Sequence, residues 1–124
     1  MKYAGFPNIT SMRISVKISE AKIEEYPGRK VSTLLDPSTV GSSDFVMGVI
    51  TYFPGCAVEP HAHDDQEGIY VLSGRGTARI GSESVELEPG VAIYIPKGVT
   101  HSVSNHFNEP LHAVLAHAPV CGPR

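Results

Sequence analysis

Residues 55–74 read GCAVEPHAHDDQEGIYVLSG, and residues 90–105 read GVAIYIPKGVTHSVSN. Both stretches contain short runs of β-forming residues that are closed by Gly, Pro or Ser. Along the chain such turn signals recur about every ten residues, which is typical of an all-β sandwich or barrel. The same reasoning predicts strands over residues 12–18, 29–35, 45–53, 69–72, 77–80, 85–88, 91–95, 101–105 and 111–117.

The N-terminal part of the chain contains one alternating segment and one helix candidate. Residues Met12 to Ile18 alternate strictly between apolar and polar types, which predicts a half-buried strand. Residues 20–26 are the only helix candidate, and about two helical turns are too few for an α/β fold. A chain of such short strands must close on itself or pair with a second chain, because long bare edges would otherwise remain.

Four side chains in the two quoted stretches could hold a metal ion. His61 and His63 are two residues apart, so on a strand both imidazoles face the same side. A bend could return the carboxylate of Glu67 to that side, and a neighbouring strand could supply His101. Taken singly, an H-x-H pair is more often an ordinary surface pair, Glu67 a solvated acid and His101 a core or turn histidine. Together, three imidazoles and one carboxylate suit Mn, Fe, Ni, Cu or Zn.

With these residues the chain resembles the cupins. The first cupin motif is matched by Gly55, His61, His63, Glu67 and Gly74, and the second by Gly90, Pro96, Gly98, His101 and Asn105. The resemblance implies one cupin domain over residues 1–124, folded as an all-β, double-stranded β-helix (a jelly-roll barrel). It also implies one divalent transition metal per chain, with two coordination positions left open. The ligands implied are His61, His63, Glu67 and His101.

The resemblance does not select a reaction, because cupins include oxygenases, isomerases, lyases, decarboxylases and non-catalytic binders. We expect a metal-dependent enzyme that acts on a small, oxygen-rich metabolite able to chelate the metal. The alternative is a non-catalytic small-molecule binder or sensor. A purely structural metal is disfavoured, because structural zinc sites are closed and usually rich in Cys. No catalytic base can be assigned from the sequence.

Composition limits the partners of the protein. A formal net charge of −3 on 124 residues argues against nucleic-acid binding by bulk attraction. No apolar run approaches the ~18 residues of a membrane span, and the N-terminus lacks the apolar core of a signal peptide. Only two cysteines are present, which favours a reducing, cytoplasmic compartment. Small cupins commonly exchange strands between two chains, so the resemblance implies a homodimer.

The remaining polar residues give weaker predictions. His112 and His117 are five residues apart on one expected strand, so they should face opposite sides. His117 shares the parity of Leu111 and Leu115 and is the better candidate for the barrel interior, although a surface or interface position is commoner for such a residue. We expect an apolar barrel wall at Val71, Ile80, Val103 and Leu115. Structural roles are expected for Tyr52, Tyr70 and Tyr94 in core or interface packing, Arg79 facing outward, His106 in a loop, Asn105 bonded to a loop, and Cys56 as a buried thiol.

Overall fold

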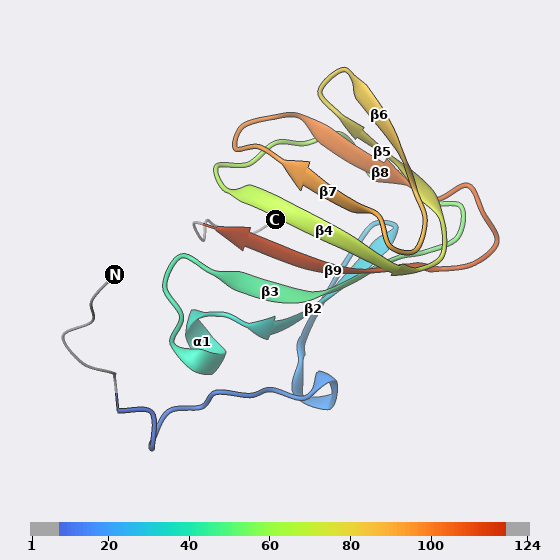
Figure 1. Cartoon of the computed structure of the whole chain (residues 1–124). Helices are drawn as coiled ribbons and strands as arrows, with labels where there is room; N and C mark the ends of the chain where they lie inside the picture. The colour runs from blue at the N-terminus through green and yellow to red at the C-terminus, as the bar shows by residue number, and fades with distance from the viewer. Residues whose placement is uncertain (1–7, 119–124) are drawn as a thin grey trace.

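The computed structural model describes residues 8–118 and consists of two antiparallel β-sheets (Figure 1). The larger sheet has the order β1 (Lys22–Tyr26), β2 (Arg29–Leu35), β3 (Val46–Tyr52), β9 (Leu111–Ala118), β4 (Gln66–Ser73), β7 (Ala92–Ile95). The smaller sheet has the order β6 (Glu83–Leu87), β5 (Gly76–Ile80), β8 (His101–Ser104). Helical structure among these residues is limited to a 3-10 turn, Ile18–Glu20, and the one-turn helix α1, Pro37–Val40. The all-β prediction is confirmed.

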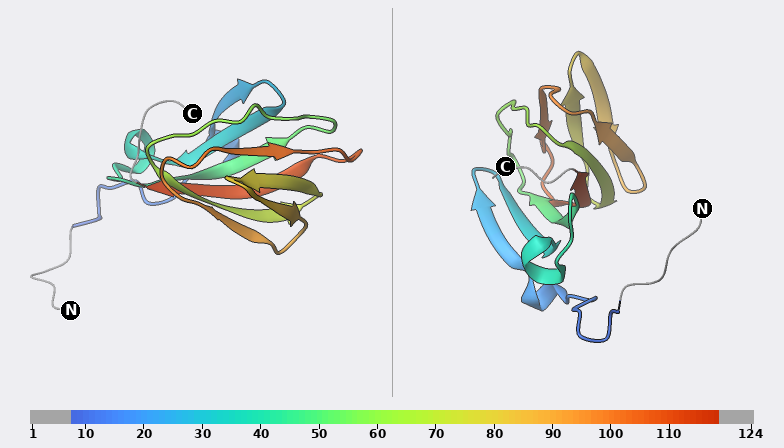
Figure 2. Two further views of the ribbon diagram at one scale, coloured as in Figure 1. Left: turned by 90° about the horizontal axis from the view of Figure 1, so that it is seen from above. Right: turned by 90° about the vertical axis from the view of Figure 1, so that its left-hand side faces the viewer.

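The two sheets face each other and enclose the core (Figure 2). Strands β3 and β9 alternate regularly between buried and less buried residues, so each strand contributes one side to the interior. Val71, Val103 and Leu115 are buried, and Ile80 packs against the same cluster, as predicted for an apolar wall. Within residues 8–118, no helix has the length and apolar character that crossing a membrane requires.

Residues 20–26 do not form a helix, so that prediction is wrong. All five residues of β1 pair with β2, from Lys22 opposite Thr33 to Tyr26 opposite Arg29. The connection is the two-residue turn Pro27-Gly28, in which Gly28 has a φ of +78°. The strand depends on pairing with a neighbour, which outweighs the local helix preference of the sequence. The Pro-Gly pair was the signal for this hairpin.

The predicted strand over residues 12–18 is also wrong. This segment is an extended arm without ladder pairing, and it runs along the outside of the molecule toward β1 (Figure 2). Ile14 is 66% exposed and Met12 is 46% exposed. The alternation of residues 12–18 gives the segment an apolar side, but a strand also needs a neighbouring strand to bond its backbone N–H and C=O groups. The edge of β2 is not available to this segment, because β1 already covers it. The other predicted strands are present with shifted ends.

Two residues of the quoted motifs fix the end of the barrel away from the arm. Gly74 has a φ of +86°, and a Cβ atom there would lie 2.2 Å from the carbonyl oxygen of Pro110. The buried side chain of Asn105 donates to the carbonyl oxygens of Tyr52 and Glu109 at 3.2 and 2.8 Å. The prediction that Asn105 bonds a loop is therefore confirmed, and β4 passes close to the β8–β9 loop because Gly74 has no side chain.

Candidate metal centre

The structure brings His61, His63 and His101 together at one end of the barrel. One ring nitrogen from each lies within 4.8 Å of the others. The ring centroids of His61 and His101 are 4.4 Å apart, and those of His63 and His101 are 4.9 Å apart. Such a cluster has the size and donor type that a single transition-metal ion requires.

Backbone pairing between the two motifs holds the histidines in place. The His61 amide donates to the carbonyl oxygen of His101 at 3.0 Å, and the His101 amide donates back to His61 at 2.9 Å. The Gly98 amide donates to the carbonyl oxygen of His63 at 2.9 Å, from a position with a φ of +77°. The neighbouring strand that supplies His101 is β8, of which His101 is the first residue, and an isolated bridge pairs it with His61.

The same ring nitrogen of each histidine is held by a neighbouring oxygen. Nδ1 of His61 bonds the Glu59 carbonyl at 3.0 Å, and Nδ1 of His101 bonds the Val99 carbonyl at 2.9 Å. Nδ1 of His63 contacts the Asp65 carboxylate. A proton on Nδ1 leaves the lone pair on Nε2, which is the form in which histidine binds a metal. The donor set therefore fits a divalent transition ion.

Glu67 lies beside two of the three imidazoles. Its Oε1 atom is 3.2 Å from Nε2 of His63 and 3.8 Å from Nε2 of His101. The side chain is only 4% exposed because Glu67 is an inward-facing residue near the start of β4. The bend through residues 64–66 therefore returns the carboxylate to the histidines, as the spacing predicted.

Burial shifts the pKa of His101, a member of the cluster, and that of Cys56 in opposite directions. It lowers the pKa of His101, which favours the neutral imidazole needed for metal binding. It raises the pKa of the Cys56 thiol, which favours the unreactive protonated form. Cys56 is half-buried beside Gly28, so it is less buried than predicted.

A second buried group, formed by Asp65 and His117, lies next to the cluster and contacts His63. Asp65 has no exposed surface, and its Oδ2 atom lies 2.5 Å from Nδ1 of His117. His117 is 5% exposed and stands opposite Glu67 in the β4–β9 register. A surface position for His117 is therefore wrong, and its parity with Leu115 was the correct signal. Asp65 was missed because the direction of a loop carboxylate cannot be derived from strand alternation.

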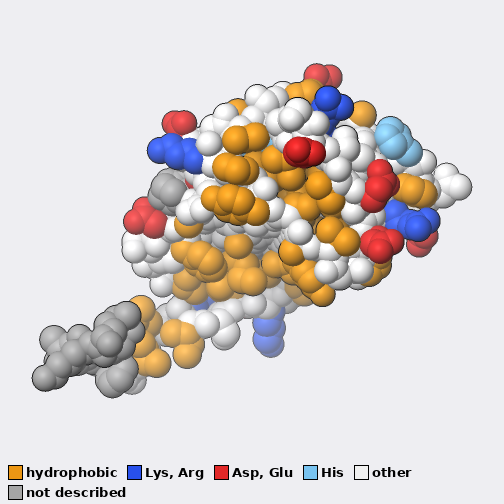
Figure 3. Space-filling model, turned by 45° about the horizontal axis from the view of Figure 1, so that its top comes forward, with side chains coloured by type: hydrophobic (Ala, Val, Ile, Leu, Met, Phe, Trp, Pro, Cys, Tyr) orange, Lys and Arg blue, Asp and Glu red, His pale blue; other side chains and the backbone are white. Residues whose placement is uncertain are grey.

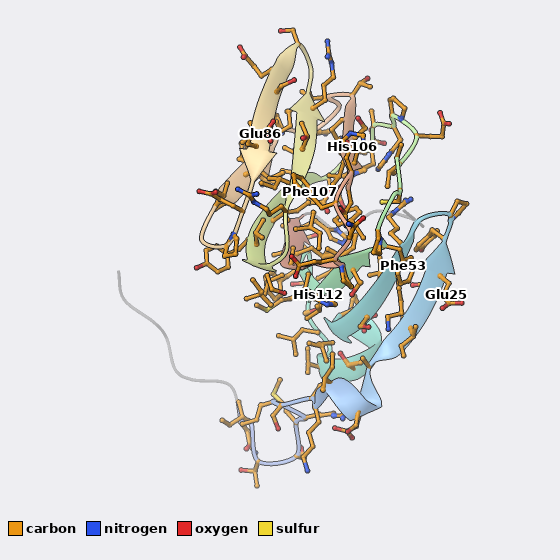
Figure 4. The ribbon with its side chains drawn as sticks, turned by 90° about the vertical axis from the view of Figure 1, so that its right-hand side faces the viewer. Glu25, Phe53, Glu86, His106, Phe107 and His112 are labelled. Carbon is orange, nitrogen blue, oxygen red and sulfur yellow. The ribbon has the colours of Figure 1, made fainter. Side chains whose placement is uncertain are left out.

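The other polar residues considered, apart from Tyr52, lie away from the cluster. Nδ1 of His112 is 3.0 Å from the Thr51 hydroxyl, whereas His106 is exposed in the β8–β9 loop (Figure 4). Arg79 is exposed, as predicted. Tyr52 packs in the core, but Tyr70 and Tyr94 are exposed.

Two hollows that share Arg29, Val58 and His61 in their linings lie at the candidate centre. The outer cleft has a volume of about 570 Å³ and is lined by residues 27–29, 56–59 and 61–63. The inner space, of about 20 Å³, lies within the barrel and is lined by His61, Glu67 and His101 together with Arg29, Tyr52 and five aliphatic residues. The outer cleft falls in the size range of small-molecule sites.

Residues 48–117 match the family model described as a cupin domain. The chain belongs to the cupin family. This cupin is 31% identical over 94 residues to the tetracenomycin polyketide synthase protein TcmJ of Streptomyces glaucescens, a match covering 75% of this chain and 63% of TcmJ. It is 33% identical over 69 residues to the dimethylsulfoniopropionate lyase DddW of Ruegeria pomeroyi, covering 56% of this chain and 45% of DddW.

The polyketide cyclase RemF of Streptomyces resistomycificus has a solved structure with the same fold. It superposes on this cupin with a TM-score of 0.73 at 24% sequence identity, covering 91% of this chain and 89% of RemF. The likeness confirms the double-stranded β-helix predicted from the two motifs.

Proposed function

We propose that this cupin is a metal-dependent enzyme that acts on a small, oxygen-rich metabolite able to chelate the metal. The proposed ligands are His61, His63, Glu67 and His101, and the ion is Mn, Fe, Ni, Zn or Cu in its divalent state. The observation that carries the proposal is the common orientation of the three histidines. In each of them Nδ1 is engaged by an outer oxygen, which leaves Nε2 available, and Nε2 of His63 and of His101 lies beside Glu67.

The charge of the centre selects the kind of ligand. Three neutral imidazoles and one carboxylate leave a net charge of +1 on a divalent ion, which favours an anionic, bidentate ligand. When bound, such an ion supplies Lewis-acid polarisation of a carbonyl or enediol, or a site for dioxygen activation. Val58, Ile69 and Val103 line the inner space, so they exclude water and strengthen the attraction between the centre and an anion.

The name of one relative supports a carbonyl-rich substrate. TcmJ carries a polyketide synthase name, and polyketide chains are built from 1,3-dicarbonyl units. The enolate of a 1,3-dicarbonyl unit is an anion with two oxygens placed for chelation. The proposed substrate class therefore includes 1,3-dicarbonyl compounds. It also includes 2-oxo acids and 2-hydroxy acids, because these are bidentate anions as well.

The proposal is tested first by metal content and then by ligand binding. Changing both His61 and His63 to Ala should remove the metal, whereas His106→Ala, a histidine in an exposed loop, should retain it. The Mn- or Co-loaded protein is then titrated with oxalate and with acetate while its electron paramagnetic or visible spectrum is recorded. We expect oxalate to perturb the spectrum and acetate to bind much more weakly.

Two results would overturn the proposal. If the double histidine variant keeps its full metal content, the site is wrong. If oxalate leaves the spectrum unchanged, the ion has no open positions and neither an enzyme nor a metal-centred binder is supported. Binding of oxalate without turnover of any oxo acid, diol or dicarbonyl compound would favour the non-catalytic binder.

We further propose that residues 1–124 form a single domain that assembles as a homodimer. The buried apolar residues form one cluster, which supports a single domain. Apolar side chains gather on the outer face over β4, β7 and β9 (Figure 3). Tyr70, Leu72 and Tyr94 on this face are 47%, 49% and 59% exposed. An exposed apolar face of this kind often marks a contact with another protein molecule.

A further inference from the structure

Arg29 begins β2 at the mouth of the barrel. It stands opposite Tyr52 in the β2–β3 register and shares strand parity with the buried Val31, so its side chain belongs to the interior face of the sheet. Arg29 lines the outer cleft together with His61 and His63, and it also lines the inner space together with Glu67 and His101. The arginine is therefore the positively charged residue that both hollows share.

Among the described residues, the Arg29 guanidinium contacts an aromatic ring and forms no ion pair with a carboxylate. Its Cζ atom lies 4.8 Å from the centre of the Tyr26 ring, in a cation–π contact. Among residues 8–118, the ion pairs formed by arginine and lysine involve Arg13 and Lys22, not Arg29. Glu59 is the one carboxylate residue in the lining of the outer cleft, and it is exposed at the rim. A half-buried arginine in this state can accept an anion from outside the protein.

The size and the lining of the outer cleft indicate which other groups the ligand carries besides that anion. Its volume exceeds what a two-oxygen chelating group needs, and much of its wall is apolar, with Pro27, Ala57, Val58 and Ala62. Arg29 is the only lysine or arginine in the lining of this cleft. A single guanidinium fork matches one carboxylate through two parallel hydrogen bonds, whereas a phosphate usually takes more donors.

We propose that Arg29 binds a second carboxylate of the substrate, separate from the oxygen pair that chelates the metal. The ligand class is then a small diacid with a chelating 2-oxo or 2-hydroxy acid at one end, a short apolar body and a carboxylate at the other end. This inference rests on the proposed function, and it adds the residue that distinguishes a diacid from a monoacid of the same length.

A matched pair of probes tests the inference. 2-Oxopentanedioate and 2-oxopentanoate share the chelating end and differ in the distal carboxylate. Their dissociation constants are measured on the Co-loaded protein by visible spectroscopy and by calorimetry. We expect the diacid to bind about 10- to 100-fold more tightly, as a charge-assisted hydrogen-bonded pair typically provides.

Three variants assign that preference to Arg29. Arg29→Gln should remove the preference for the diacid and leave the affinity for oxalate and the metal content unchanged. Arg29→Lys should retain part of the preference, because it keeps the charge but loses the fork. Arg79→Gln removes an exposed arginine from β5 and should keep the full preference.

Each contrary result has a separate meaning. Equal binding of the two oxo acids by the unmodified protein, with oxalate still bound, would overturn the role of Arg29 and leave the proposed function standing. Weaker oxalate binding in Arg29→Gln would also overturn it, because Arg29 would then contact the chelating group. If oxalate does not bind at all, the proposed function fails together with this inference.

Discussion

Oδ2 of Asp65 lies 2.5 Å from Nδ1 of His117, and the other oxygen of the same carboxylate contacts Nδ1 of His63. Asp65 thus joins a candidate metal ligand in the loop before β4 to the inward face of β9. Because Asp65 has no exposed surface, water does not compete for these contacts. The orientation of the His63 imidazole depends on this carboxylate.

Replacement of Asp65 by Asn should therefore weaken metal binding. The change keeps the volume but removes the charge that holds His63, and losses of such outer partners typically lower metal affinity about 10- to 100-fold. The measurement is a competition titration with a chelator of known affinity. Asp64→Asn, at the exposed neighbouring position, is the matched control. Equal affinities for the two variants would contradict the role of Asp65.

Removal of His117 should lower stability more than removal of a surface histidine. His117→Ala takes away a partner of a fully buried carboxylate, which is expected to cost about 2 kcal/mol in the free energy of unfolding. His106→Ala, in the exposed loop, should change it by less than about 0.5 kcal/mol. Urea denaturation of the metal-free protein measures both. In the Asp65→Asn, His117→Ala double variant the losses should be less than additive, because the two side chains share one interaction.

The sequence could predict His61, His63, Glu67 and His101 as one set because two spaced motifs resemble those of the cupins. Spacing alone indicated that His61 and His63 could face one side and that a bend could return Glu67, whereas the approach of His101 to His61 joins residues forty positions apart. The Asp65–His117 pair could not be predicted in this way. Its two members are 52 positions apart, and their contact depends on the register of β4 against β9. Parity placed His117 inside the barrel but could not identify its partner.

The same distinction explains the errors at the N-terminus. The alternation of Met12 to Ile18 and the helix preference of residues 20–26 are local properties. The Pro27-Gly28 turn decides which segment covers the edge of β2, because it forms a tight hairpin that pairs β1 with β2. The arm that precedes β1 is left without a neighbour to pair with.

The stability of the protein should depend on Asp36 at acid pH. Burial opposes ionisation of this side chain, but hydrogen bonds from Ser38, Lys22 and Thr39 outweigh it and lower its pKa to about 2. Because the pKa is lower in the folded state, ionised Asp36 stabilises the protein above the unfolded pKa of 3.8. That contribution is lost as the pH falls toward 2.

Asp36→Asn should flatten this part of the pH profile. Unfolding free energies of the metal-free protein, measured between pH 6 and about pH 2, should fall less steeply for the variant than for the unmodified chain. At neutral pH the variant should be about 1 kcal/mol less stable, because it replaces the charged N-cap of α1. Asp44→Asn, at an exposed position, is the control. Parallel profiles for the Asp36 variant and the unmodified chain would refute the prediction.

Alanine substitutions at Gly74 and Gly90 distinguish the cost of backbone strain from the cost of a steric clash. Both glycines have positive φ, +86° and +94°, but a Cβ at Gly74 would meet the Pro110 carbonyl whereas one at Gly90 would meet nothing within 4 Å. Gly90→Ala should cost about 1 kcal/mol in unfolding free energy and Gly74→Ala about 3 kcal/mol. Thermal or urea denaturation provides the comparison, and equal losses would show that the β8–β9 loop moves aside freely.

The apolar outer face should control the oligomeric state. Light scattering of the unmodified protein should give about twice 13.3 kDa. The Tyr70→Glu, Leu72→Glu double variant should give the monomer mass, because two buried charges would oppose contact between copies. Ile23→Glu, on the edge strand β1 and 57% exposed, should leave the dimer intact. A dimer that persists in the double variant would place the interface elsewhere.

The reciprocal backbone bonds between His61 and His101 have a consequence for the folding of the barrel. These two bonds join segments forty positions apart. Together with the bonds from Val58 to Val103 and from Gly98 to His63, they form an irregular seam outside the regular ladders, which we expect to form late in folding. An ion bound by the side chains of His61 and His101 would hold these two segments together. Loss of the ion would then be felt as faster hydrogen exchange at the His61 and His101 amides, while the amides of β3 and β9 would stay protected. The end of the barrel that carries the histidines should therefore stay closed for longer in the metal-bound protein than in the metal-free protein.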